Sequence, residues 1–326
     1  MKKPRALITG IAGQDGSYLA ELLLREGFEV FGIERRATLE ATHNFWRVAH
    51  IQSQIEVHAG SVDSFPSIYS ILKKVVPDYC FHFAAQSFVS YSFEDEFATM
   101  NVNVNGTHYL LSAIAQVCPD CRLYFAGSSE MFGKVDSSPQ TEETRFRPRS
   151  VYGISKLVGH ELVRNYRESN KLFACTGILY NHESPRRGLE FVTRKITSTA
   201  AQIKLGLAHE LRLGNIDAKR DWGFAGDYVE AIYAMLMQPT PEDFVIGTGE
   251  IHSVRNFLEI AFGELGLNYL DYIIIDQKFF RPAEEHLLIA DPNKAKSKLG
   301  WRPKVAFEDL VRMMIRADYD YYMKKR

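Results

Sequence analysis

A tyrosine and a lysine are four residues apart in Tyr152-Gly153-Ile154-Ser155-Lys156, within a segment that has the apolar spacing of a helix. This separation places both side chains on one helix face. An ammonium group beside a phenol favours the phenolate, so Tyr152 is predicted to act as a general acid and base near neutral pH. For this short motif taken alone, the alternative is a surface tyrosine with a chance lysine.

Before this helix, an apolar run at residues 123–126 leads into Gly127-Ser128-Ser129-Glu130. Small and polar residues after a short apolar run are typical of the carboxyl end of a buried parallel strand. Open α/β sheets bind their ligands at that edge. The segment from residue 123 to residue 156 is therefore expected to hold the reacting groups.

A glycine-rich turn follows the first predicted strand. The strand run at residues 6–9 leads into Gly10-Ile11-Ala12-Gly13-Gln14-Asp15-Gly16, and a helical run at residues 17–24 comes next. Glycines at such a turn allow a tight bend and bring backbone amides to a pyrophosphate at the helix N-terminus. A dinucleotide cofactor is therefore expected at Gly10, Gly13, Gln14, Asp15 and Gly16.

The second strand run, at residues 29–33, ends at Glu34-Arg35-Arg36, where a dinucleotide-binding fold contacts the adenosine ribose. An acidic residue there favours the 2′-hydroxyl of NAD, whereas an arginine accommodates the 2′-phosphate of NADP. Arg35 and Arg36 together predict NADP, with NAD as the alternative because of Glu34.

Strand-like and helix-like runs alternate along the chain. Further strand runs lie at residues 55–58, 79–84, 123–126, 173–179 and 244–246, and helical stretches lie at 67–76, 97–117, 152–168 and 227–237. This order predicts an α/β fold with a doubly wound parallel Rossmann sheet. A smaller C-terminal substrate domain is expected to be interleaved with it. The dinucleotide-binding domain would take residues 1–179 and about 225–249, and the substrate domain 180–224 and 250–326.

Arginines recur in charged turn segments after residue 179, at Arg186, Arg187, Arg220 and Arg281. Three such loops in one region indicate an anionic ligand, because arginine binds phosphate in a bidentate manner.

Composition argues against several classes of protein. A formal charge of −1 predicts no nucleic-acid-binding surface, and no apolar run approaches the ~20 residues that span a bilayer. The first five residues lead straight into a strand without a signal-type cleavage site, so a cytoplasmic location is expected. Four cysteines make no disulfide framework, and Cys118 and Cys121 have no second pair, so they are expected to be structural and no metal site is predicted.

Together these residues resemble an extended short-chain dehydrogenase/reductase, and more specifically the GDP-mannose 4,6-dehydratase family. The resemblance spans nearly the whole chain. Its most specific parts are Asn181-His182-Glu183-Ser184-Pro185-Arg186-Arg187-Gly188 and Phe191-Val192-Thr193-Arg194-Lys195-Ile196. The glycine-rich turn and the Tyr-x-x-x-Lys motif belong to the wider superfamily.

By this resemblance, the catalytic positions are Ser128, Glu130, Tyr152 and Lys156, with Ser128 where the family usually has threonine. The cofactor positions add Ala84, His182 and Arg187 to Arg35, Arg36, Tyr152, Lys156 and the turn residues. The substrate positions are Ser87, Ser128, Glu130, Asn181, Val192, Lys195, Gly214, Arg220, Arg281 and Glu284.

The implied reaction removes water from a GDP-linked hexose. Oxidation at C4 acidifies the C5 proton, after which the C6 hydroxyl leaves and the stored hydride returns to C6. Tyr152 is expected to take the C4 hydroxyl proton, with Lys156 and Ser128 stabilising the charge, and Glu130 to take the C5 proton. Because Ser129 stands where other nucleotide-sugar dehydratases place an aspartate, the acid that protonates the leaving oxygen stays open.

The sequence departs from the family pattern at Glu34, at Ser61, which replaces an aspartate near the adenine, and at Phe88, which replaces a histidine beside the sugar. Alternatives are therefore a GDP-manno-heptose 4,6-dehydratase, a nucleotide-sugar 4-epimerase or 4-keto reductase, and a dinucleotide-binding sensor without catalysis. A homodimer or homotetramer is expected, because the helical stretches 97–117 and 152–168 resemble those of a dimeric four-helix bundle in this superfamily.

Overall fold

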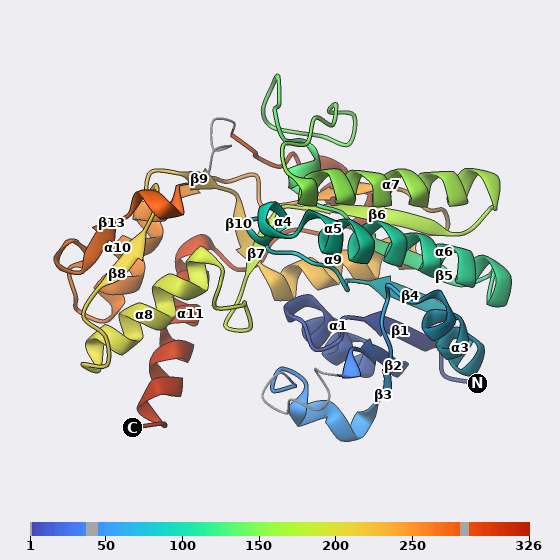
Figure 1. The fold of residues 1–326 in the computed structure, drawn as a ribbon, viewed down its shortest axis with the longest axis horizontal. Helices are drawn as coiled ribbons and strands as arrows, with labels where there is room; N and C mark the ends of the chain where they lie inside the picture. Colours follow the sequence, from blue (N-terminus) through green and yellow to red (C-terminus); the bar gives the residue numbers. More distant parts are fainter. Residues whose placement is uncertain (1, 37–44, 281–286) are drawn as a thin grey trace.

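A seven-stranded sheet forms the centre of the computed structural model, which describes residues 2–36, 45–280 and 287–326 (Figure 1). Across the sheet the strand order is β11-β6-β5-β4-β1-β2-β3, and all neighbouring strands are parallel. This order reverses direction between β1 and β4, which opens a crevice at the carboxyl edge. The predicted α/β class and parallel sheet are confirmed. The strands are β1 Arg5–Thr9, β2 Glu29–Glu34, β3 Ile55–Ala59, β4 Tyr79–His82, β5 Arg122–Ala126, β6 Ala174–Leu179 and β11 Phe244–Ile246.

Helices cover both faces of the sheet, which explains why its strands are apolar on both sides. On β1, Leu7 packs in one hydrophobic cluster and Ile8 in another, as the alternation of a strand requires. The cluster of Ile8 includes residues of α1 (Gln14–Arg25) and α9 (Ala225–Met237). The cluster of Leu7 includes residues of α3 (Phe65–Val75), α6 (Gly106–Val117) and α7 (Val151–Ser169).

The C-terminal half has a hydrophobic cluster of its own, at the left of Figure 1. Apolar faces of α8 (Val192–Lys204), α10 (Val254–Glu264) and α11 (Phe307–Met323) meet there. The C-terminal half also contains three short strand pairs: β7 Asn181–Glu183 with β10 Trp222–Phe224, β8 Leu211–Leu213 with β13 Ile273–Ile275, and β9 Lys219–Arg220 with β12 His252–Ser253. Within the described ranges, no helix is both long and apolar enough to cross a membrane.

The helix predicted at residues 97–117 is interrupted. After α4 (Tyr91–Glu94), the chain forms α5 (Glu96–Met100), a π-helical turn at Asn101–Asn105 and then α6. The buried Asn103 side chain accepts a hydrogen bond from the Gln86 amide at 2.8 Å and donates to Ser155 Oγ at 2.9 Å. Apolar periodicity alone does not reveal such a turn or the hydrogen bonds of Asn103 to Gln86 and Ser155, which are distant in sequence.

Two further predictions need correction. The strand predicted at residues 79–84 ends at His82, because the chain then leaves the sheet to line a cavity. The charged segments around Arg186 and Arg220 are not turns throughout, because Asn181–Glu183 forms β7, Arg220 ends β9 and Trp222–Phe224 forms β10. All four cysteines are unpaired and buried, which agrees with the structural role expected for Cys118 and Cys121.

Candidate active site

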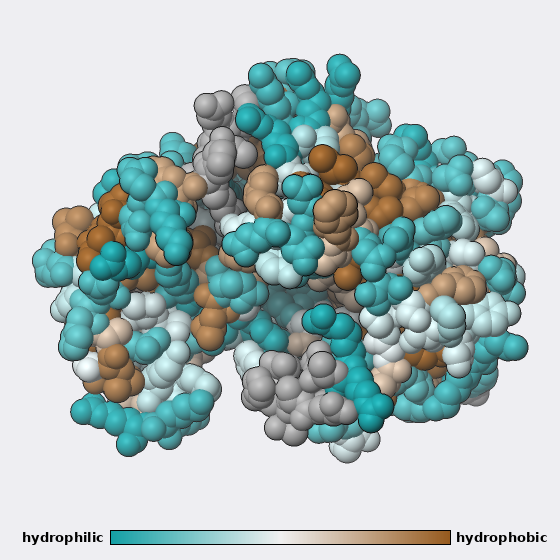
Figure 2. Space-filling model, in the orientation of Figure 1, coloured by the Kyte–Doolittle hydropathy of each residue, from teal (hydrophilic) through white to brown (hydrophobic). Residues whose placement is uncertain are grey.

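A cavity of about 1210 Å³ lies between the carboxyl edge of the sheet and the C-terminal half, where Figure 2 shows this face hollowed. Residues far apart in the chain meet there. Arg36 is exposed and outside this lining, and Arg281 and Glu284 lie outside the described residues. The predicted site residues in the lining are Gly10, Gly13, Gln14, Asp15, Gly16, Arg35, Ala84, Ser87, Ser128, Glu130, Tyr152, Lys156, Asn181, His182, Arg187, Val192, Lys195, Gly214 and Arg220.

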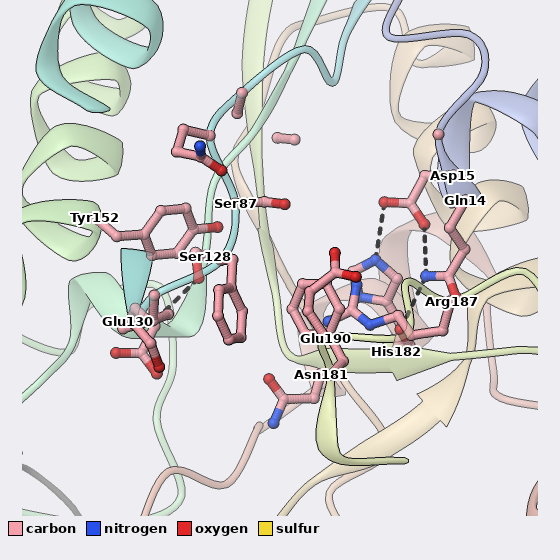
Figure 3. A pocket seen from close by; sticks show the side chains of 18 of the residues that line it. Gln14, Asp15, Ser87, Ser128, Glu130, Tyr152, Asn181, His182, Arg187 and Glu190 are labelled. Carbon is pink, nitrogen blue, oxygen red and sulfur yellow. Dashed lines mark hydrogen bonds and ion pairs between the residues drawn. The ribbon is translucent and has the colours of Figure 1, made fainter. Parts of the chain in front are cut away.

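The four predicted catalytic side chains come from two adjoining elements. Ser128 and Glu130 follow β5, with Glu130 in the short 3-10 turn Ser129–Met131, and Tyr152 and Lys156 lie near the start of α7. Tyr152 is 8% exposed and Lys156 is 4% exposed. In Figure 3 Tyr152 and Ser128 lie close together, and Glu130 lies below them with its carboxylate directed away from the Tyr152 hydroxyl. The structure therefore brings a phenol, a hydroxyl and a carboxylate together.

Local hydrogen bonds explain this juxtaposition. The Glu130 amide donates to Ser128 Oγ at 3.2 Å, which begins the turn that presents Glu130. Ser150 caps α7 in the same manner, accepting from the Gly153 amide at 3.0 Å. A Cβ on Gly153 would lie 2.6 Å from the Glu130 carbonyl oxygen. Glycine at position 153 therefore lets the start of α7 approach the turn that carries Glu130.

Burial dominates the electrostatics of the Tyr152 and Lys156 pair. It raises the pKa of Tyr152 to about 12, against the effect of a hydrogen bond with Ser128, and the charge of Glu130 raises this pKa further. Burial also lowers the pKa of Lys156 to about 8. Lys156 Nζ donates to the Ala126 carbonyl oxygen at 2.8 Å and lies 5.9 Å from the Tyr152 ring centroid. The shared helix face is confirmed. Lys156 is not among the main causes of the Tyr152 pKa shift, so its effect on the phenolate stays a prediction.

The glycine-rich turn fits the pyrophosphate of a dinucleotide. Helix α1 begins at Gln14 after Gly13, and no side chain caps its first amides. A Cβ on Gly16 would lie 2.4 Å from the Gly10 carbonyl oxygen, so this position admits only glycine if the turn is to fold onto the helix. The N-terminal turn of α1 lines the cavity, where its amides and the helix dipole favour an anion.

A buried ion pair connects this turn to β7. His182 Nε2 lies 2.9 Å from Asp15 Oδ2, and His182 Nδ1 lies 2.7 Å from the Tyr180 carbonyl oxygen (Figure 3 shows the first). The charge of His182 and its hydrogen bond lower the pKa of Asp15 although burial opposes them, and Asp15 likewise raises the pKa of His182 against burial. Because both of its nitrogens face acceptors, the protonated form of His182 can donate from each, which agrees with its raised pKa. Gln14 adds a hydrogen bond to the His182 carbonyl oxygen at 3.0 Å.

The Asp15→Asn variant is expected to bring the pKa of His182 below its ordinary value of 6.5, because burial and Arg187 then act without the carboxylate that opposed them. The stabilising contribution of His182 is complete below pH 6.5 and is lost as pH rises through its raised pKa. That of Asp15 is complete above pH 3.8 and is lost as pH falls through its lowered pKa. The loss in the free energy of unfolding caused by Asp15→Asn should therefore be largest between pH 3.8 and pH 6.5.

Proton NMR titration of the imidazole signals measures this shift directly. His160 is an internal reference, because burial lowers its pKa and Asp15 is not among the charges that affect it. A His182 pKa that stays above 6.5 in Asp15→Asn would show that another group holds the proton.

The predicted substrate residues lie toward the C-terminal half. Lys195, on α8, donates from Nζ to the Arg212 carbonyl oxygen at 2.7 Å, and the same nitrogen lies 3.9 Å from the Phe279 ring centroid. Burial lowers the pKa of Lys195. Arg220 lies in β9 and Asn181 at the start of β7. Positive charge, an amide and an aromatic ring thus line the end of the cavity away from the glycine-rich turn.

Sequence reasoning missed a buried ion pair behind the cavity. Arg194 Nε lies 2.8 Å from both carboxylate oxygens of Asp318, and its Nη1 donates to the Arg187 carbonyl oxygen at 3.0 Å. Asp318 is 1% exposed. Helix α11 thereby supports the loop that presents Arg187. A buried aspartate on the apolar face of α11 was the available signal, but its partner is 124 residues away.

The strand order, the glycine-rich turn and the Tyr-x-x-x-Lys helix define an extended short-chain dehydrogenase/reductase. A family model described as "GDP-mannose 4,6 dehydratase" matches residues 7–314, so the chain belongs to the GDP-mannose 4,6-dehydratase family, a family of hydro-lyases. "GDP-mannose 4,6 dehydratase 1" of Arabidopsis thaliana is 48% identical, with 99% of this chain and 92% of that protein covered. The human GDP-mannose 4,6 dehydratase is 45% identical, with 98% and 93% covered.

The fold is shared with solved structures of low sequence identity. The dTDP-glucose 4,6-dehydratase DesIV from Streptomyces venezuelae, solved with NAD, has a TM-score of 0.85 at 24% identity and covers 98% of each chain. At this identity the likeness concerns the fold alone.

Proposed function

We propose that this protein converts GDP-mannose to GDP-4-keto-6-deoxymannose and water. The observation that carries the proposal is that Glu130, in the turn that Ser128 begins, lines the same cavity as Tyr152 and a dinucleotide-type turn. Membership of the GDP-mannose 4,6-dehydratase family supports the same reaction. A plain epimerase or reductase needs the hydroxyl, tyrosine and lysine but has no use for a carboxylate at this strand end.

In this proposal Tyr152 takes the proton of the C4 hydroxyl. Ser128 holds the phenolate that must form, because its hydroxyl has the larger of the two effects that lower the pKa of Tyr152 against burial, the other being the charge of Arg187. Lys156, with its pKa of about 8, carries positive charge at neutral pH close to the Tyr152 ring. Glu130 takes the C5 proton once C4 is a ketone. The acid that protonates the leaving C6 oxygen stays open.

We infer that a nicotinamide dinucleotide is the cofactor, held by Gly10, Gly13, Gln14, Asp15, Gly16, Ala84, His182 and Arg187. It would supply a temporary hydride store, taking the C4 hydride and returning it at C6. Arg35 and Arg36 favour NADP in this proposal, because two cations beside the ribose suit a 2′-phosphate. Among proteins of this fold, RMD of Pseudomonas aeruginosa was solved with NADPH and DesIV with NAD.

The GDP-sugar is proposed to lie against Ser87, Asn181, Val192, Lys195, Gly214 and Arg220, with Arg281 and Glu284 kept as sequence-based predictions. The division into residues 1–179 with about 225–249 and residues 180–224 with 250–326 is also proposed. Support comes from the separate hydrophobic cluster of the C-terminal half. A homodimer or homotetramer and a cytoplasmic location stay predictions from sequence.

GDP-manno-heptose is a second candidate substrate because of Phe88. Its ring packs edge-to-face on Phe191 at 5.5 Å between centroids, which gives the cavity an apolar wall where the family usually has histidine. Incubation with GDP-mannose, GDP-manno-heptose and other GDP-sugars, followed by mass analysis, separates the candidates. Loss of one water from GDP-mannose without consumption of NADPH is expected. Epimerised or reduced products without dehydration would contradict the proposal.

A further inference from the structure

The Glu34 carboxylate lies at the end of the cavity formed by the first two strands. Its Oε1 accepts a hydrogen bond from the Arg35 amide at 3.2 Å, and its Oε2 accepts one from the Ala12 amide at 3.4 Å. Ala12 belongs to the glycine-rich turn, and both Ala12 and Glu34 line the cavity. The carboxylate is therefore directed at the cofactor turn and not at solvent beyond the sheet.

Strand pairing fixes this location. Thr9 and Ile33 are partners in the register of β1 and β2, and the Gly10 amide donates to the Ile33 carbonyl oxygen at 3.1 Å. The residue after Ile33 must consequently stand beside the turn that receives the pyrophosphate. In dinucleotide-binding folds a carboxylate at this point binds the 2′-hydroxyl of the adenosine ribose.

Arg35 provides the opposite chemistry at the same strand end. It is exposed, yet it lines the cavity next to Glu34. A 2′-phosphate would gain from this guanidinium but would meet the negative charge of a carboxylate that two backbone amides hold in place. A 2′-hydroxyl can donate to that carboxylate directly. Each form of the cofactor thus finds one favourable partner.

We propose that Glu34 makes the cofactor site dual, binding NAD through the ribose 2′-hydroxyl with an affinity comparable to that for NADP. The inference rests on the proposed function only in assuming that the cavity holds a dinucleotide. Arg35 serves the phosphorylated form, and Glu34 is the specificity-determining residue that keeps the unphosphorylated form bound.

Titration calorimetry with ADP-ribose and its 2′-phosphate tests the adenosine end alone, since neither probe carries a nicotinamide. The wild-type Kd values should agree within about tenfold. Glu34→Gln should shift their ratio by about tenfold toward the 2′-phosphate, because an acceptor loses its charge. Arg35→Ala should shift the ratio the opposite way. Glu29→Gln is the matched control, because it removes an exposed carboxylate at the other end of β2 and should leave the ratio unchanged.

Two results would overturn the proposal. One is a wild-type preference for the 2′-phosphate above about tenfold, and the other is a ratio that Glu34→Gln does not move. Neither result depends on catalysis. The product assay therefore tests the proposed dehydration of GDP-mannose independently.

Discussion

Replacement of Tyr152 by phenylalanine is expected to lower the turnover of GDP-mannose by about 10²–10⁴-fold, because it removes the group proposed to take the C4 hydroxyl proton. The bound cofactor should stay oxidised, since hydride leaves C4 only as that proton leaves. Tyr152 is 8% exposed, so phenylalanine keeps its packing and loses only the hydroxyl. Stopped-flow absorbance of reduced nicotinamide, recorded together with product mass, measures both effects.

Tyr124→Phe is the matched control for this variant. Tyr124 is fully buried in β5, close to the same strand end, and its hydroxyl has no hydrogen-bond partner within the described part of the chain. Removing that hydroxyl should leave turnover unchanged. If Tyr152→Phe still forms reduced nicotinamide at the wild-type rate, a different group takes the C4 proton.

Much of the sheet was accessible from sequence because its cause is local. Apolar runs such as those of β1 and β5 end in glycine or polar residues, and a parallel sheet places all such ends at one edge. The position of Ser128 and Glu130 at that edge follows from that rule, whereas Tyr152 and Lys156 reach the cavity from α7. Residue spacing does not, however, show how deeply each side chain is buried.

The errors share a physical origin in burial and in contacts between distant residues. Spacing placed Lys156 on the same helix face as Tyr152. It could not show that burial lowers the pKa of Lys156 and raises that of Tyr152, or that the ammonium donates to the Ala126 carbonyl oxygen. The pairing of Asp15 with His182 spans 167 residues, and no local pattern in either segment indicates the other. The π-helical turn at Asn103 was missed too, because that side chain bonds to Gln86 and Ser155, which its local helical pattern does not indicate.

The structure also shows how two carboxylates with similar sequence surroundings acquire different proposed roles. Glu34 and Glu130 each follow the apolar run of a sheet strand and line the same cavity. Glu34 stands beside the glycine-rich turn, where the proposed cofactor would lie, whereas Glu130 lies in the turn that follows Ser128. Position in the strand order, not residue type, separates a cofactor-selecting group from a reacting one.

Glu130→Gln is expected to stop the reaction after oxidation of C4. The amide keeps the shape of the side chain but cannot take the C5 proton, so product formation should fall by about 10²–10⁴-fold. Hydride transfer from C4 should continue, because the proposed mechanism assigns that step to Tyr152, Ser128 and Lys156. The negative charge of Glu130 raises the pKa of Tyr152, so its removal should ease rather than hinder that step.

Three measurements together identify this block. Reduced nicotinamide should accumulate as new near-ultraviolet absorbance, exchange of the C5 hydrogen with solvent should slow, and little 6-deoxy product should appear. Glu143→Gln, which alters an exposed glutamate away from the cavity lining, should retain full turnover. Tyr152→Phe differs from Glu130→Gln in leaving the cofactor oxidised, so the two variants separate oxidation from elimination. Dehydration of GDP-mannose by Glu130→Gln at the wild-type rate would remove the carboxylate from the mechanism, and with it the main structural argument for a dehydratase over an epimerase or reductase.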